Sequence, residues 1–418
     1  SLWRRVRQQK DCGYTGRKCM SLYFLTFLLL AAGVLLVWFR FPHEEKIYQG
    51  CWMAMAACLC FRFGQGTDYI TYHALYETIP AVMDLSKGYI CGFYPEIGWR
   101  VLSAAFKVFH APFWIFTMTL GLFEMLLLHR YLGRYGRSKT MGLFMLYPVL
   151  FITYMVSGLR QGLAICVFLG ILVPFYVEKQ WVRYILGALA ASAFHRVGYV
   201  WLLLPIVSYL PVWMMAGAVG LSFACGLVLQ VHAVEQWFTE LVPAYHLKQF
   251  LLEGTVSYFA LSERLLSFCV LCVLYFWYQK KYTVIEKQTE NLFKAYMCGT
   301  CFYLLLCGSS YYASRYCVIF KVLEGAVLLS MIQWDQWIPR LAAVFFFGLT
   351  LLMGCKNLDA MIREGIWYDS SVVNIWNFPY VSVFDRDKIM DYIPYDEILW
   401  EIYGYNIEDQ KLWMIEEK

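Results

Sequence analysis

The feature that most constrains this chain is its repeated runs of apolar residues, several of them about as long as a membrane's hydrocarbon core is thick. Hydrophobic residues make up 60% of the 418 positions and charged residues only 16%, whereas a soluble protein has roughly a quarter charged. The pattern therefore predicts an all-α polytopic membrane protein. The net charge of +5 is too small and too dispersed to indicate nucleic-acid binding, so we expect no nucleic-acid partner.

We expect about twelve transmembrane helices, because a spanning helix needs about 20 apolar residues. They divide the chain into a basic N-terminal tail (1–21), a transmembrane domain (22–355) with outer loops 64–111 and 231–262, and an acidic, aromatic C-terminal tail (356–418). The predicted spans are 22–39, 47–63, 112–131, 141–157, 161–177, 184–197, 198–211, 212–230, 264–279, 292–308, 314–331 and 340–355.

Basic residues near the helix ends predict the orientation, because Lys and Arg are enriched in cytoplasmic loops. The basic connections at 130–139, 179–183 and 280–287 fall on one side of the predicted spans, and we assign that side to the cytoplasm. The outer loops and the C-terminal tail are then extracytoplasmic, which agrees with the tail's thirteen Asp and Glu against six Lys and Arg. The basic tail at 1–21 disagrees: the charge rule places it inside, whereas the helix count places it outside. We give the three internal connections more weight.

Four polar groups lie at the outer ends of predicted spans, where burying each is costly and needs a reason. The first runs from Arg62 to Glu77, and in it Asp68, Tyr72 and Tyr76 recur at four-residue spacing, which places them on one helical face. The alternative is an interfacial helix anchored by its tyrosines, with Asp68 as its N-terminal cap.

The second and third groups are Arg160-Gln161 and His195, each close to the outer end of a predicted span. We expect His195 to lie deeper in the outer leaflet than Arg160, which would form a funnel open to the outside. The alternatives are an arginine that extends to the interface and a histidine bound by a carbonyl of a neighbouring helix.

The fourth group is a pair of arginines, Arg264 and Arg315, each at the start of a span. Guanidinium groups bind phosphate oxygens in bidentate fashion. Together with Arg160 they suit a substrate that is anchored in the outer leaflet by a lipid diphosphate. The seven histidines are scattered without metal-ligand spacing and arginines can supply the positive charge, so we expect no metal and no cofactor.

These segments together resemble the EpsG family, the Wzy-type polymerases of exopolysaccharide and capsule synthesis, in the same order over residues 60–320 or so. Gly158-Leu159-Arg160-Gln161-Gly162 and Ala164 match the family's I-R-Q-x-x-A motif. Ala193-Phe194-His195 matches the start of its L-F-H-x-S-A motif, but Val197 and Gly198 replace the Ser-Ala. Three further stretches resemble the first outer loop, the E-P-G-F segment and the later arginines: Arg62 to Glu77, Tyr94-Pro95-Glu96-Ile97-Gly98-Trp99, and Arg264 with Ser314-Arg315-Tyr316.

The resemblance implies an integral-membrane, lipid-phosphosugar-dependent glycosyltransferase of GT-C-like architecture, located in the bacterial cytoplasmic membrane. Such an enzyme transfers a growing glycan from undecaprenyl diphosphate onto a second lipid-linked repeat unit at the outer face, with inversion at the anomeric carbon. The implied partners are undecaprenyl-diphosphate-linked oligosaccharide, membrane lipid, and the flippase and chain-length regulator of the same pathway.

The reaction needs positive charge on the diphosphate leaving group and a base for the attacking hydroxyl. Arg160 is the candidate for the first role, helped by Arg315 and Arg264. His195 is a candidate base because its ordinary pKa lies near working pH, and Asp68 is its rival. The remaining candidates for substrate binding are Gln161, Tyr72 and Glu96.

Several other functions remain open. A flippase or transporter of the same glycolipid often has internal repeats and polar groups near the bilayer midplane, whereas here no repeat is visible and the polar groups are at the outer edge. An O-antigen-ligase-like transferase would use much the same chemistry with another acceptor. An acyltransferase fits the arginines less well, and a purely structural protein leaves the ordered motifs unexplained.

Overall fold

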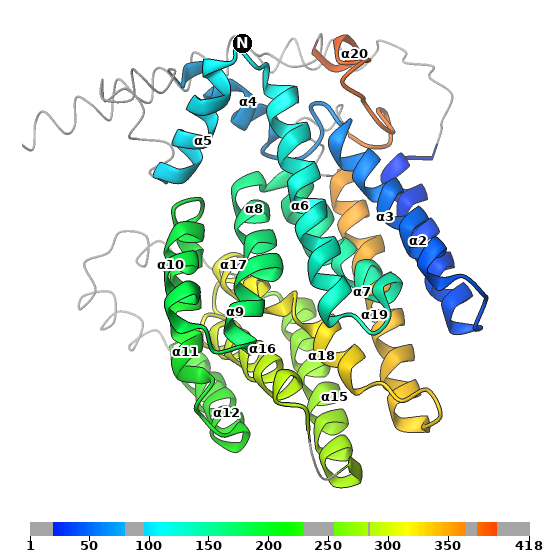
Figure 1. Cartoon of the computed structure of the whole chain (residues 1–418), viewed down its shortest axis with the longest axis vertical. Coiled ribbons are helices and arrows are strands. Elements are labelled where there is room, and N and C mark those ends of the chain that lie inside the picture. The colour runs from blue at the N-terminus through cyan, green and yellow to red at the C-terminus, as the bar shows by residue number, and fades with distance from the viewer. Residues whose placement is uncertain (1–19, 80–95, 230–254, 283–284, 364–373, 391–418) are drawn as a thin grey trace, which may run out of the picture. The chain divides into compact units, whose positions relative to one another are not determined.

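The computed structural model describes residues 20–79, 96–229, 255–282, 285–363 and 374–390. These residues form helices and no strand, with one isolated antiparallel bridge between Arg62 and Ser382. Residues 1–19, most of the outer loop 231–262 and most of the C-terminal tail lie outside the described ranges. In chain order (Figure 1), the helices are α2 Leu22–Trp38, α3 Glu44–Cys60, α4 Tyr69–Thr78, α5 Ile97–Val108, α6 Phe113–Tyr135, α7 Lys139–Leu146, η3 Tyr147–Ser157, α8 Leu159–Val167, η4 Phe168–Leu172, α9 Val173–Val177, α10 Trp181–Ser192, η5 Arg196–Leu203, α11 Leu204–Val207, α12 Val212–Val228, α15 Tyr258–Tyr282, α16 Lys287–Leu305, α17 Ser310–Lys321, α18 Glu324–Met331, α19 Trp337–Arg363 and α20 Asp387–Met390.

Five of the described helical segments are long and apolar enough to cross a membrane. Helical structure overlaps every predicted span, which confirms the positions of the helices and a helical, multi-pass membrane protein. The full number of crossings and the GT-C-like architecture stay predictions. The five segments are Phe113–Tyr135, Lys139–Ser157, Leu159–Val177, Tyr258–Tyr282 and Trp337–Arg363.

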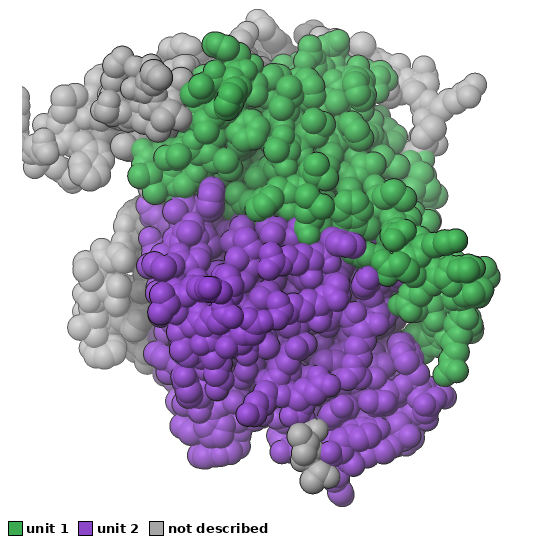
Figure 2. All heavy atoms as spheres, in the orientation of Figure 1, with its two compact units in different colours: residues 1–126, 151–163, 351–418 green, residues 127–150, 164–350 purple. Residues whose placement is uncertain are grey.

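The chain forms two compact units (Figure 2). Unit 1 contains residues 1–126, 151–163 and 351–418, and unit 2 contains residues 127–150 and 164–350. Each unit therefore combines stretches that are far apart in the sequence.

In unit 1, the C-terminal segment 374–390 packs on the first residues of the outer loop. The Phe63 amide donates to the Val381 carbonyl at 2.8 Å, and the Leu22 amide at the start of α2 donates to the Pro379 carbonyl at 3.3 Å. The start of α2, the first residues of the outer loop and the segment 374–390 therefore lie at one end of this unit.

In unit 2, ion pairs join the three connections that the basic residues predicted to share one side. Arg134 at the end of α6 pairs with Glu178 after α9, and Arg137 pairs with Glu286 at 3.5 Å, just before α16. The common side of these connections is confirmed, and its assignment to the cytoplasm stays a prediction. The interior of unit 2 is apolar and aromatic; the rings of Phe168 and Trp201, for example, stack with centroids 4.7 Å apart.

Candidate functional site

A buried arginine attaches the outer loop of unit 1 to the helix end that precedes Arg160. The Arg62 guanidinium donates to the Leu59 carbonyl at 2.7 Å and to the Met155 carbonyl at 2.9 Å. Gly66 permits this close approach, because its φ is +120° and a Cβ there would lie 2.2 Å from the Val156 carbonyl oxygen. Arg62 therefore has a structural role that the sequence alone did not predict.

Arg160 lies in the first turn of α8, directly after the π-helix η3 ends at Ser157. Its guanidinium forms an ion pair with Glu96, and its Nε donates to the Tyr72 hydroxyl at 3.3 Å. The side chains of Arg160 and Glu96 are only 15% and 7% exposed. The structure thus brings together three of the predicted site residues, from α4, from the residue before α5 and from α8, and π-helical turns frequently occur at functional sites.

Aromatic side chains of α4, α5 and α6 pack around this group. The Trp99 ring contacts Tyr72 and Phe116, with ring centroids 5.4 and 5.3 Å apart, and Phe116 also stacks on Tyr76. The Tyr76 hydroxyl donates to the Ala111 carbonyl at 2.7 Å. The aromatic packing lies on the Tyr72 side of the Arg160–Glu96 pair, and the pair itself is largely buried, where charge interactions are stronger than in water.

Asp68 is the residue before α4, as the capping interpretation expected, but its side chain makes no capping hydrogen bond. Burial raises the pKa of Tyr72; the neighbouring Arg160 lowers it and Asp68 raises it. Tyr72 is therefore a neutral hydroxyl at physiological pH. Gln161 is buried next to Arg160 in the chain. Of the segment that resembles the E-P-G-F motif, Tyr94 and Pro95 lie outside the described residues.

The other predicted site residues belong to unit 2. His195 precedes the 3₁₀-helix η5, and its Nδ1 accepts a hydrogen bond from the Val197 amide at 3.3 Å. Arg264 lies in α15 and Arg315 in α17. The expected convergence of these groups with Arg160 stays a prediction.

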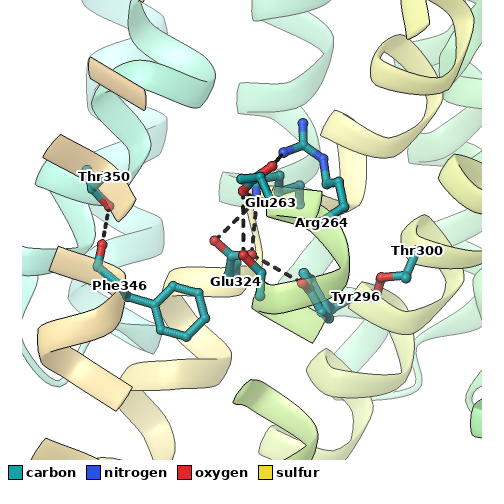
Figure 3. Close-up of polar contacts among 9 residues, drawn as sticks. Glu263, Arg264, Tyr296, Thr300, Glu324, Phe346 and Thr350 are labelled. Atoms are coloured by element: carbon teal, nitrogen blue, oxygen red, sulfur yellow. Dashed lines mark hydrogen bonds and ion pairs between the residues drawn. The ribbon is translucent and has the colours of Figure 1, made fainter. Parts of the chain in front are cut away.

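Arg264 belongs to a second charged group, in unit 2, whose other members are absent from the sequence-based predictions. Lys321 contacts both Glu263 and Glu324, and Glu263 also pairs with Arg264 (Figure 3). Tyr296 donates to Glu324 at 3.2 Å. The available signal was a lysine and a glutamate three positions apart inside the predicted apolar span 314–331.

Both groups fall within the region that matches a known family. The model of the EpsG family matches residues 51–358. The chain belongs to the EpsG family. The resemblance carried by the motifs is thereby confirmed, and membership in this family indicates a Wzy-like polysaccharide polymerase, a glycosyltransferase-like enzyme with a lipid-linked oligosaccharide substrate. Comparison with curated proteins and with solved structures gives no match.

The matched region of this EpsG-family protein includes every predicted site residue from Asp68 to Arg315. The C-terminal segment 374–390 that packs on the outer loop lies beyond it. Among the described residues, no group of three or more His, Cys, Asp and Glu side chains is arranged to hold a metal ion.

Proposed function

We propose that this EpsG-family protein polymerises glycan repeat units in exopolysaccharide or capsule biosynthesis. It transfers the growing chain from undecaprenyl diphosphate onto a lipid-linked repeat unit at the outer face of the bacterial cytoplasmic membrane. The observation that carries the proposal is the buried Arg160, which Glu96 and Tyr72 hold beside the outer loop of unit 1.

The reaction breaks the bond between the anomeric carbon and a phosphate oxygen, and forms one between that carbon and the acceptor hydroxyl. Negative charge then develops on the departing diphosphate. Arg160 meets this need because a guanidinium binds phosphate oxygens in the same forked geometry as a carboxylate. In this proposal a phosphate oxygen replaces the Glu96 carboxylate on Arg160, and Tyr72 keeps the guanidinium in place through Nε. Attack from the opposite face inverts the anomeric configuration, and arginine charge replaces a metal.

The attacking hydroxyl must lose its proton to a base. The Nδ1 atom of His195 accepts the Val197 amide proton, so a neutral His195 carries its own proton on Nε2. That tautomer suits a hydrogen-bond donor toward the substrate better than a base. Asp68 lies close enough to Tyr72 to raise the pKa of that hydroxyl. We therefore favour Asp68 as the base, His195 as a donor to the substrate, and Gln161, Arg264 and Arg315 as further binding groups.

The test is a reconstituted assay in which purified protein in liposomes receives lipid-diphosphate repeat units and the products are separated by length. We expect a ladder from the wild-type protein, and a rate lower by about 10²-fold or more from Arg160→Ala, as for loss of one stabilising donor. Arg363→Ala is the matched control, because that side chain is 77% exposed at the end of α19. Repeat units that cross the bilayer without lengthening would instead indicate a transporter.

A further inference from the structure

The charged group of unit 2 is a chain of alternating charges that runs across four helices. Tyr296 of α16 donates to Glu324 of α18, and Lys321 of α17 lies 3.1 Å from Glu324. Lys321 also pairs with Glu263 of α15, which in turn pairs with its neighbour Arg264. Figure 3 shows Glu263 between Arg264 and Glu324. The two carboxylates balance the two cations, so the group is neutral as a whole.

Structural stability alone gives a weak reason for this chain. Removing two charges from water costs several kcal/mol per ion, and well-packed apolar residues in place of a buried pair are often as stable or more so. Here the side chains of Lys321 and Glu263 are each 2% exposed. A buried charged residue in a membrane protein is by default a hypothesis for a functional site. Each end of the chain therefore has to be considered for a role.

At the Arg264 end of this chain of charges, a buried hydrogen-bond donor is unsatisfied. Arg264 is 8% exposed, its carbon Cζ lies 5.4 Å from the centroid of the Tyr303 ring, and its Nε has no hydrogen-bond partner. An unsatisfied buried donor is costly and needs an explanation. Glu263 pairs with the guanidinium through Nη1, and the Cys317 side chain is also in hydrogen-bond contact with Arg264, which leaves the Nε donor for another acceptor.

We propose that Glu263 is a positioning residue that holds Arg264 so that its Nε edge receives an oxygen of a diphosphate. Lys321 and Glu324 balance each other's charge within the buried group, and the positioning of Arg264 is assigned to Glu263 alone. This inference rests on the proposed function, because it assigns the anionic end of the lipid-linked substrate to Arg264. The same chemistry would recognise the headgroup of a lipid diphosphate or free pyrophosphate.

Two double variants separate positioning from structure, because each removes one buried cation and one buried carboxylate. Glu263→Gln with Lys321→Met deprives Arg264 of its negatively charged partner. Lys321→Met with Glu324→Gln leaves the Glu263–Arg264 pair intact, and the amide that replaces the Glu324 carboxylate can still accept from Tyr296. Full-length protein in nanodiscs would be titrated with undecaprenyl diphosphate, with inorganic pyrophosphate and undecaprenol as competitors. Apparent melting temperature in the same nanodiscs monitors folding.

We expect the first double variant to bind undecaprenyl diphosphate about 10- to 100-fold more weakly than wild type, as for loss of one charge-assisted hydrogen bond. The second should bind within about twofold of wild type. Where a ladder is formed, the first variant should raise KM with little change in kcat. Competition by pyrophosphate indicates that the diphosphate alone is recognised, and competition only by the lipid diphosphate indicates that the lipid is also needed; both agree with the inference.

Equal affinity in the two variants overturns the positioning role, because the two then differ in nothing that matters to the ligand. So does a wild-type protein that binds no diphosphate, or one for which undecaprenol competes as well as undecaprenyl diphosphate. Tight binding that depends on Glu263 without any ladder leaves this inference standing and refutes the polymerase instead. Failure of the two ideas is therefore distinguishable.

Discussion

His73 on α4 gives a pH-dependent stability that can be worked out from its surroundings. Its ring stacks on Phe113 with centroids 5.0 Å apart, and its side chain is 16% exposed. Burial lowers the pKa of His73 from its ordinary 6.5 to about 4; Glu77 opposes this shift and Lys107 adds to it. His73 is therefore neutral in the folded protein across the physiological range.

The direction of the pH effect on stability follows from the pH at which the folded and the unfolded protein each bind a proton on His73. Between pH 6.5 and about 4, the unfolded chain takes up a proton on His73 that the folded protein does not, so stability falls as pH falls. The gap between these two pKa values, at about 1.4 kcal/mol for each pKa unit, amounts to about 3 kcal/mol. Above pH 6.5 both states are neutral at His73 and the effect is absent.

The measurement is the apparent melting temperature of wild type and His73→Phe in detergent from pH 7.5 to pH 4. Phenylalanine keeps a stacked ring against Phe113 and cannot titrate. Subtracting the variant's melting temperature from that of wild type therefore removes the effect of the carboxylates that both proteins contain. We expect wild type to lose stability relative to the variant as pH falls through this window. His129→Phe is the matched control, because His129 is exposed. A wild-type–variant difference that stays constant from pH 7.5 to pH 4 would refute the reasoning.

Two further predictions concern the segment that carries the outer loop. Gly66→Ala should destabilise the protein by about 1–3 kcal/mol or more, because Gly66 has a positive φ and the Val156 carbonyl lies close to it. Gly50→Ala in α3 is the control and should be neutral or stabilising, because nothing lies within 4 Å of the added Cβ. Equal melting temperatures for the two variants would contradict this prediction. Gln65→Leu should lower the free energy of unfolding by about 2 kcal/mol and expose the 374–390 segment to amide hydrogen exchange. The reason is that the Gln65 side chain donates to the Phe378 carbonyl at 2.9 Å and accepts from the Val381 amide at 3.1 Å. Unchanged protection of the Val381 amide from exchange would contradict this prediction.

The helices and their common ends follow from local sequence, which is why they were predictable. An apolar run of sufficient length forms a helix in a membrane because its backbone groups must be satisfied within the segment. The basic connections could be assigned to one common end of the helices from their lysine and arginine content alone. The Arg134–Glu178 and Arg137–Glu286 pairs agree with that assignment. The same periodicity placed Tyr72 on a helical face, and α4 confirms that helix.

The partners of the charged residues depend on tertiary packing and were not predictable in this way. Arg160 and Glu96 are 64 positions apart, and Lys321 and Glu263 are 58 apart. No periodicity connects such positions, so the sequence indicated Arg160 and Glu96 separately but not their pairing, and it did not indicate Glu263. The segment 374–390 was likewise predicted only as part of a tail, because its hydrogen bonds with Phe61 and Phe63 join backbone atoms, which leave no pattern in the sequence.

The two arginine groups share a property that bears on how such a reaction can turn over. Arg160 is paired with Glu96, and Arg264 with Glu263, so neither guanidinium is an isolated cation in an apolar environment. An isolated buried guanidinium would bind the diphosphate of the substrate nearly as tightly as the transition state, and binding both equally does not speed the chemical step. At Arg160, Glu96 and the diphosphate compete for the same donors in the proposed function, so the carboxylate weakens ground-state binding; Glu263 holds another edge of Arg264 and does not compete. Charge that grows on the leaving oxygen as the bond breaks favours the diphosphate over Glu96 on Arg160, and Glu96 can return when the diphosphate departs.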